Sequence, residues 1–178
     1  FAKSLGLVHE KTQFYAIDGV HNASIETNQV RLEMLPVASF VKDGNDFLLD
    51  TGSPHYVHFS EGNSIDIVDF GRSIRYSEKY GKDGVNVNVV ETIDTDCIKV
   101  ETYERGVEDE TLSCGTGVTA CALIYMYVHQ ERKLREVNVQ TKGGDLFIES
   151  DAYSVENGFS NIWLTGPTKH VFDGSIAI

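Results

Sequence analysis

The chain has 178 residues and a mass of 19.8 kDa, which suits one full-sized domain or two small lobes with a buried core. Its 15 Lys and Arg against 27 Asp and Glu give a net charge of −12, and such a field repels nucleic acid. The sequence has neither an apolar run long enough to cross a bilayer nor the pattern of a signal peptide. A soluble, cytoplasmic protein that binds neither nucleic acid nor membrane is therefore expected.

Residues 1–7 predict the last turns of a helix that ends at Gly6, because glycine favours the left-handed conformation that closes a helix. No capping residue or turn precedes them. We therefore expect the chain to begin inside an element, as a fragment of a longer protein.

Short segments that alternate apolar and polar residues dominate the rest of the chain and predict mostly β-structure. Turn-forming pairs such as Asp18-Gly19 and Asn157-Gly158 separate them, so hairpins and an antiparallel or mixed sheet are expected. The expected strands are residues 13–17, 29–35, 47–50, 85–91, 97–103, 137–141, 146–150, 162–165 and 171–178.

Two stretches favour helix. Residues 65–80 are amphipathic, whereas residues 117–131 include a segment, 118–128, that is apolar on nearly every face. A helix that is apolar all round has to be enclosed, and a strongly curved sheet wrapped around it is the natural container. The sequence therefore predicts an α+β fold in which a curved mixed or antiparallel sheet surrounds a central apolar helix.

The three cysteines, Cys97, Cys114 and Cys121, are odd in number, and their spacing does not match a zinc site. We expect reduced thiols, with Cys97 on a half-buried strand and Cys121 inside the apolar helix, both filling core space. Cys114 differs because it stands in Ser113-Cys114-Gly115-Thr116-Gly117, immediately before that helix.

A thiol at the start of a helix can act as a base or nucleophile, because the helix dipole and the free N–H groups favour its thiolate. Gly115 and Gly117 would let a ligand carboxylate approach those N–H groups, and Thr116 adds a hydroxyl. The alternative is a glycine-rich strand-to-helix turn that contains an incidental cysteine.

Two further segments carry candidate functional groups. In Tyr103-Glu104-Arg105-Gly106 the arginine could hold a carboxylate, while Glu104 could bind an ammonium group or accept a thiol proton, which together suit an amino acid. The alternative is an exposed surface pair. Gly52-Ser53-Pro54-His55 places a histidine on a rigid turn, where a structural role is the alternative to catalysis.

Taken together, these motifs resemble those of the diaminopimelate epimerases, isomerases that interconvert LL- and meso-diaminopimelate without a cofactor. The resemblance extends over almost the whole chain. The segments that carry it are Gly52-Ser53-Pro54-His55, Gly84-Val85-Asn86, Tyr103-Glu104-Arg105-Gly106, Glu110 to Gly117, Lys142-Gly143-Gly144, Thr165-Gly166-Pro167-Thr168 and Val171-Phe172-Asp173-Gly174.

The resemblance implies an enzyme of lysine and cell-wall precursor biosynthesis with two pseudo-symmetric lobes, each a curved sheet around a helix and each contributing one cysteine. One thiolate removes the α-proton while the other thiol protonates the opposite face of the carbon. The resemblance implies Cys114, Glu104 and His55 as catalytic residues and diaminopimelate as the small-molecule partner, with no cofactor and no metal. The implied substrate-binding residues are Ser53, Asn86, Glu104, Arg105, Gly115 and Thr116.

The chain departs from the family pattern at three places. The second cysteine motif, Cys-Gly-Asn-Gly, is absent, Ser53 stands where the family has asparagine, and the 107–109 bridge is one residue longer. We therefore expect residues 1–35 to be the tail end of an N-terminal lobe that is otherwise missing. Residues 36–165 form a complete C-terminal lobe that carries Cys114, and residues 166–178 are a strand that returns to the N-terminal lobe.

Several alternatives stay open at this point. With one acid/base thiol, the fragment is expected to have little or no activity alone, and its partner is the missing lobe. A homodimer is also left open. The alternative functions are a proline-racemase-like or phenazine-biosynthesis-like isomerase with the same two-lobed architecture, or a non-catalytic amino-acid-binding lobe.

Overall fold

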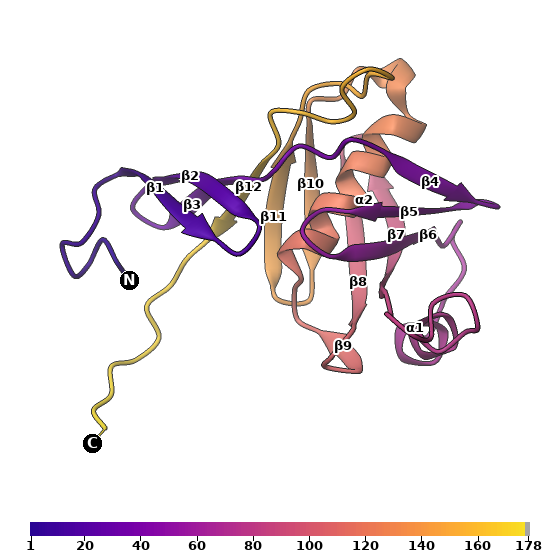
Figure 1. Ribbon diagram of the computed structural model, residues 1–178, viewed down its shortest axis with the longest axis horizontal. Coiled ribbons are helices and arrows are strands. Elements are labelled where there is room, and N and C mark those ends of the chain that lie inside the picture. The colour runs from indigo at the N-terminus through magenta and orange to yellow at the C-terminus, as the bar shows by residue number, and fades with distance from the viewer. Residues whose placement is uncertain (177–178) are drawn as a thin grey trace.

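The computed structural model describes residues 1–176, which form one twelve-stranded mixed sheet and two α-helices (Figure 1). The order of strands across the sheet is β1-β2-β3-β12-β11-β10-β8-β7-β6-β5-β4, and β9 pairs with β8. The elements are β1 (Lys11–Ala16), β2 (Gly19–Ile25), β3 (Gln29–Glu33), β4 (Phe40–Asp43), β5 (Asp46–Asp50), β6 (Pro54–Phe59), α1 (Ile67–Arg75), β7 (Asn86–Asp94), β8 (Cys97–Glu104), β9 (Asp109–Thr111), α2 (Gly115–Val128), the 3-10 helix η1 (Gln130–Arg132), β10 (Glu136–Thr141), β11 (Gly144–Glu149) and β12 (Trp163–Pro167).

The helix α2 is enclosed by the curved sheet, as its sequence predicts (Figure 1). Every residue from 117 to 126 is buried, and the helix has no charged side chain. Strands β5, β6, β7, β8, β10 and β11 all contact it. Because full burial of a large apolar side chain stabilises a fold by about 1.5–3 kcal/mol, this helix is the centre of the hydrophobic core.

Two pairs of strands are parallel, β6 with β7 and β8 with β10, and the other pairs are antiparallel. A parallel pair needs a crossover connection, and each of these pairs has one that contains a helix, α1 between β6 and β7 and α2 between β8 and β10. Asp66 caps α1 by accepting hydrogen bonds from the N–H groups of Val68 and Asp69, both at 3.0 Å. Gly71 packs so tightly that a Cβ there would lie 2.3 Å from Tyr103 Cβ.

Strands β1, β2 and β3 extend away from the main body, to the left in Figure 1, and β12 connects them to β11. Residues 1–7 precede them as a helix-ending turn: the N–H groups of Gly6 and Leu7 donate to the carbonyls of Lys3 and Ala2, each at 3.0 Å, and Gly6 has a φ of +70°. Gly6 thus has the positive φ of a helix C-cap, but residues 2–6 are turn rather than helix, so the predicted helical turns are not found.

Eight of the expected strands are confirmed with small shifts at their ends, and the expected helices are confirmed as α1 and α2, although α1 ends at Arg75 rather than residue 80. The strand expected over residues 171–178 is wrong for its described part, because residues 168–176 have no regular secondary structure. Residues 177–178 lie outside the described residues. Val171 and Phe172 are exposed and have no neighbouring strand among residues 1–176 to pair with, and a strand without a partner is not stable. Strands β2, β4, β6 and β9 were not expected.

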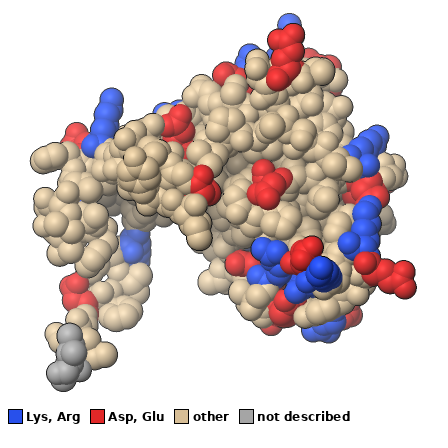
Figure 2. Space-filling view, viewed as in Figure 1, with Lys and Arg blue, Asp and Glu red and all other residues tan. Residues whose placement is uncertain are grey.

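Charged residues of both signs mix over the part of the surface where α1 lies, while the centre of the same face is mostly uncharged (Figure 2). Arg75 pairs with Glu108 at 3.4 Å, and Lys79 pairs with Asp43 at 2.5 Å. The Lys79–Asp43 pair is exposed enough to contribute little to stability, whereas the Arg75 side chain is mostly buried. Within residues 1–176, neither helix is long and apolar enough to span a membrane.

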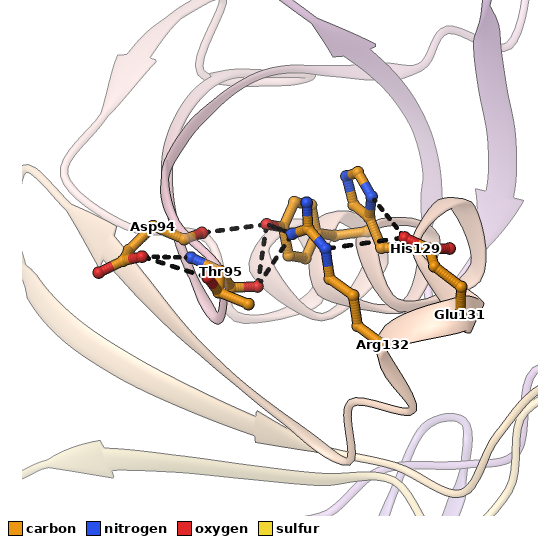
Figure 3. A network of polar contacts seen from close by, with 6 residues as sticks. Asp94, Thr95, His129, Glu131 and Arg132 are labelled. Carbon is orange, nitrogen blue, oxygen red and sulfur yellow. Dashed lines mark hydrogen bonds and ion pairs between the residues drawn. The ribbon is translucent and has the colours of Figure 1, made fainter.

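The C-terminal end of α2 is fastened by a polar network (Figure 3). The buried Tyr125 hydroxyl donates to the backbone carbonyls of Asp94 and Thr95, at 3.1 Å each, in the turn between β7 and β8. Arg132 Nη1 donates to Thr95 O at 3.2 Å and to the Tyr125 hydroxyl at 2.9 Å, and its Nε lies 3.7 Å from Glu131. The helix is therefore held at this end by hydrogen bonds as well as by packing.

Replacing Tyr125 with phenylalanine tests this network. We expect Tyr125→Phe to lower the free energy of unfolding by about 1 kcal/mol, because it removes hydrogen bonds without leaving a cavity. Tyr127→Phe is the matched control, since the Tyr127 hydroxyl makes no hydrogen bond to another residue in the 1–176 range. Urea denaturation measures both changes, and equal losses for the two variants would contradict the assignment.

Candidate active site

Cys114 is the N-cap residue of α2, with φ −126° and ψ 107°, and its side chain is partly exposed. The first intrahelical hydrogen bond joins the Val118 N–H to the Cys114 carbonyl at 2.9 Å. The N–H groups of Gly115, Thr116 and Gly117 precede it and have no acceptor within the helix. The thiol and three amide groups therefore share the positive end of the helix, which favours a bound carboxylate.

The hydroxyl of Thr116 connects the thiol to a buried histidine. Thr116 Oγ1 lies 3.5 Å from Cys114 Sγ and 2.9 Å from His55 Nε2. Ser53 Oγ lies 3.0 Å from the same ring nitrogen and 3.3 Å from Thr116 Oγ1. The three motifs that carry Ser53, His55 and Cys114–Thr116 thus meet at one end of α2.

Asn88 fixes the tautomer of His55. The Asn88 amide nitrogen donates to Tyr56 O at 2.9 Å and to His55 Nδ1 at 3.2 Å, while its oxygen accepts from the Thr102 hydroxyl at 2.9 Å. Nδ1 is therefore the acceptor nitrogen of the ring, and the proton of the neutral imidazole lies on Nε2. His55 can then donate to Thr116, whose own hydroxyl proton is free to be donated to Cys114.

The pKa of His55 is lowered to about 4, chiefly by burial and to a smaller extent by the positive charge of Arg105, against the opposing effect of the hydrogen bond with Asn88. The side chain has no exposed surface. His55 is therefore neutral near pH 7 and acts here as a hydrogen-bond donor. A row of hydrogen-bond donors therefore runs from Asn88 through His55 and Thr116 to the Cys114 sulfur.

Asn86 holds two loops of the site together. Its amide nitrogen donates to Ser53 Oγ and to Pro54 O, each at 3.2 Å, and its oxygen accepts from the backbone N–H of Arg105 at 2.9 Å. The Arg105 guanidinium donates to Asp83 O at 2.7 Å. Asn86 thus holds the backbone at the end of β8 against the Ser53 loop, and the Arg105 guanidinium is held by Asp83.

The glycines of the helix start allow a close approach. A Cβ at Gly117 would lie 2.6 Å from Asn88 Oδ1 and 3.3 Å from His55 Cε1, so only glycine lets α2 pack against this network. Thr51 adds a further link, because its hydroxyl donates to the Thr116 carbonyl at 2.8 Å. Backbone and side-chain contacts together fix the first turn of α2.

All three cysteines are free, but only Cys114 is partly exposed. Burial raises the pKa of Cys97, and it raises that of Cys121 well above its ordinary value. Both therefore stay protonated and inaccessible near neutral pH. Cys114 is the one accessible thiol among the described residues.

The structure thus brings together Ser53, His55, Asn86, the backbone of Arg105, Cys114, Gly115 and Thr116. Glu104 ends β8 next to this group, but within residues 1–176 no hydrogen bond or ion pair joins its carboxylate to Cys114.

Sequence reasoning missed Thr51, Asn88 and Thr102. A signal for Asn88 exists, because Asn86 and Asn88 alternate with valines and so lie on the same face of β7. Thr102 lies directly opposite Asn88 on β8, a pairing that depends on register and leaves no trace in the sequence.

Comparison with known sequences identifies the protein family. The family profile described as "Diaminopimelate epimerase" matches residues 47–171. Among curated proteins, the diaminopimelate epimerase of Flavobacterium psychrophilum is 41% identical over 179 residues, which cover 99% of this chain and 68% of that protein. The diaminopimelate epimerase of Aquifex aeolicus is 34% identical, over 99% of this chain and 66% of that protein. The chain thus spans about two thirds of the length of these relatives.

Solved structures agree on the fold. The PhzF-family phenazine biosynthesis protein of Bacillus anthracis has a TM-score of 0.67 at 12% identity and covers 94% of this chain and 70% of its own. The "probable proline racemase" of Agrobacterium radiobacter K84 has a TM-score of 0.66 at 15% identity, over 99% of this chain and 64% of its own. At such identities the likeness is one of fold alone.

The two buried histidines, His21 and His55, are expected to titrate at different pH values. Burial lowers the pKa of His55 to about 4, whereas the carbonyl of Glu33, together with the carboxylate of Asp18, raises the pKa of His21 above 6.5. Between about pH 4 and 6.5, His21 is therefore charged and His55 neutral. Two-dimensional NMR of the ring nitrogens measures both, and a common midpoint near 6.5 would contradict the geometry.

The lowered pKa of His55 also makes the stability of the fold depend on pH. Because the unfolded chain binds a proton at His55 near pH 6.5 and the folded chain binds it only near 4, protonation favours unfolding in that window. The contribution of His55 to stability is complete above pH 6.5 and is lost as the pH falls toward 4.

Proposed function

The chain belongs to the diaminopimelate epimerase family, a family of isomerases, and on that premise we propose that it carries one of two acid/base thiols that invert an α-carbon of diaminopimelate. The observation that carries the proposal is the row of donors from Asn88 through His55 and Thr116 to Cys114 at the start of α2. A structural turn with an incidental cysteine would not need three ordered side chains behind the sulfur.

The proposed reaction is a proton transfer on each side of one carbon. The Cys114 thiolate removes the α-proton and becomes a thiol, leaving a planar carbanion whose charge spreads into the substrate carboxylate. The free N–H groups at the start of α2 stabilise that charge as it develops. A second thiol gives its proton to the opposite face and becomes a thiolate, so the two sulfurs have exchanged states after one turnover. In the reverse direction the roles of the sulfurs are exchanged.

The second thiol has to come from elsewhere in the complete protein. Cys121 is enclosed within α2, and Cys97 is buried on β8, so neither can face Cys114 across a substrate. We propose that residues 1–35 and 166–178 belong to a partner lobe that supplies it, and that residues 36–165 are the lobe that carries Cys114.

The substrate contacts are assigned to the groups around the helix start. The N–H groups of Gly115 and Thr116 are placed to hold the carboxylate on the reacting carbon, and Arg105 carries a positive charge for an acidic substrate. Ser53 and Asn86 offer polar atoms at the same rim. Glu104 would hold an ammonium group or assist Cys114 once substrate orders its side chain.

A proline-racemase-like or phenazine-biosynthesis-like activity has less support. The structures with those names share 12% and 15% of residues with this chain, whereas the diaminopimelate epimerases of Flavobacterium psychrophilum and Aquifex aeolicus share 41% and 34%. A purely binding lobe would not require the ordered hydrogen-bond donors behind Cys114.

The 178-residue chain by itself is expected to have little or no epimerase activity, because it holds one accessible thiol. The measurement is the rate of conversion of LL- to meso-diaminopimelate. Exchange of the α-proton for deuterium in deuterated water is the readout. Conversion by the isolated chain at the rate of the complete protein would overturn the two-thiol proposal.

Replacing Cys114 with alanine in the complete protein should lower kcat by roughly a hundredfold to ten-thousandfold, the usual contribution of a positioned acid/base group. Cys97→Ala is the control for loss of a thiol, since Cys97 is buried away from α2's start and should leave kcat unchanged. Survival of turnover in the Cys114→Ala protein would show that the site is assigned wrongly.

A further inference from the structure

A second arginine lies beside Arg105, at the end of α1. Arg75 is the last residue of that helix, and its side chain is only 14% exposed. A Cβ on Gly84 would lie 2.5 Å from Arg75 Cζ and 2.7 Å from Arg105 Cδ, so the two side chains lie together over this glycine. Gly84 also has a φ of +72°. Only glycine leaves room here, and the loop before β7 therefore brings two positive side chains into one place.

The two guanidinium groups have different partners. Arg75 Nε lies 3.4 Å from Glu108 Oε1, and Arg75 Nη1 donates to Gly81 O at 3.3 Å. Arg105 Nη1 donates to Asp83 O at 2.7 Å, but within residues 1–176 no carboxylate forms an ion pair with Arg105. The charge of Arg75 is therefore compensated by the chain itself, while that of Arg105 is available to an anionic ligand.

The turn that follows β8 holds Glu108 in one orientation. Glu108 has a φ of +62°, a backbone conformation that costs free energy in a residue with a side chain. Its N–H donates to the Glu104 carbonyl at 2.8 Å and so closes the turn. Its carboxylate accepts from the Gly106 N–H and from the hydroxyl of the buried Tyr103, both at 3.1 Å. These contacts hold the strained residue in place and direct its carboxylate toward the end of α1.

We propose, on the basis of the proposed function, that Arg75 and Glu108 are positioning residues for Arg105. Arg75 fills the space beside the stem of Arg105, and its planar group supports that stem over Gly84. Two like charges so close together repel each other, and Glu108 supplies the counter-charge that lets them stay side by side. Neither residue contacts the substrate in this scheme, and both act through Arg105.

The first measurement uses Glu108→Gln in the complete protein. The substitution preserves the size of the side chain and an oxygen for the Gly106 N–H, but it removes the counter-charge. We expect KM for LL-diaminopimelate to rise about tenfold with kcat unchanged, because a contact made equally in the bound substrate and the transition state is weakened.

Asp109→Asn is the matched control for the loss of one negative charge. Asp109 is the next residue in the chain, and its carboxylate accepts from the Glu110 N–H at 2.8 Å. In the part of the chain that the structure describes, this carboxylate forms no ion pair with either arginine. Asp109→Asn should therefore change neither KM nor kcat.

The second measurement asks whether Glu108 acts through Arg105. In an Arg105→Gln protein, Glu108→Gln should weaken substrate binding no further, because the side chain that it positions is gone. The dissociation constant of LL-diaminopimelate is measured by calorimetry in complete proteins that also carry Cys114→Ala, so that turnover does not interfere.

Full weakening by Glu108→Gln in the Arg105→Gln protein would overturn the inference, since Glu108 would then act on the site independently of Arg105. An unchanged or lower KM, or a fall in kcat alone, would also overturn it. In these cases conversion by the unaltered complete protein still supports the proposed function. Absence of that conversion would overturn the proposed function and this inference with it.

Discussion

Residues 117–126 of α2 are buried on every side, and water has to be excluded from all of them at once. A flat sheet covers one face of a helix, so the strands around this one must curve until the surface closes. The crossover that threads the helix through the curve also produces the parallel pairing of β8 with β10. The first turn of α2 then necessarily emerges at the rim, and Cys114 with it.

The polar groups behind Cys114 are stable in the interior because each one has a partner. His55, Asn88 and Thr102 are buried beside the apolar core, where an unpaired polar atom would be costly. Their hydrogen bonds join β6, β7, β8 and α2, so the elements that make the core also set the angles of the site. The core therefore holds the side chains behind Cys114 in place, and they face the sulfur without rearrangement.

The sequence allowed the enclosed helix, the cysteine at its start and most of the strands to be predicted, because each has a local signal: an apolar run, a glycine-rich start or an alternation of period two. Strand β6 lacked that signal since most of its middle is buried on both faces. The segment 171–178 has apolar residues typical of a strand, but within residues 1–176 it has no neighbouring strand to pair with, so its described part is not a strand.

Contacts between distant segments left no signal at all. Asp18 and His21 are adjacent within their hairpin, yet the approach of Asp18 to Gly52 depends on where β12 places that hairpin.

The absence of charged side chains from α2 has an electrostatic consequence. Dissolved ions screen charges within about 8 Å at physiological salt, but they cannot enter the packed interior through which the helix runs. The field at Cys114 comes from the free N–H groups of the partly exposed first turn, and dissolved ions do reach that turn. Salt therefore acts on this helix only at its start, even in a chain whose net charge is −12.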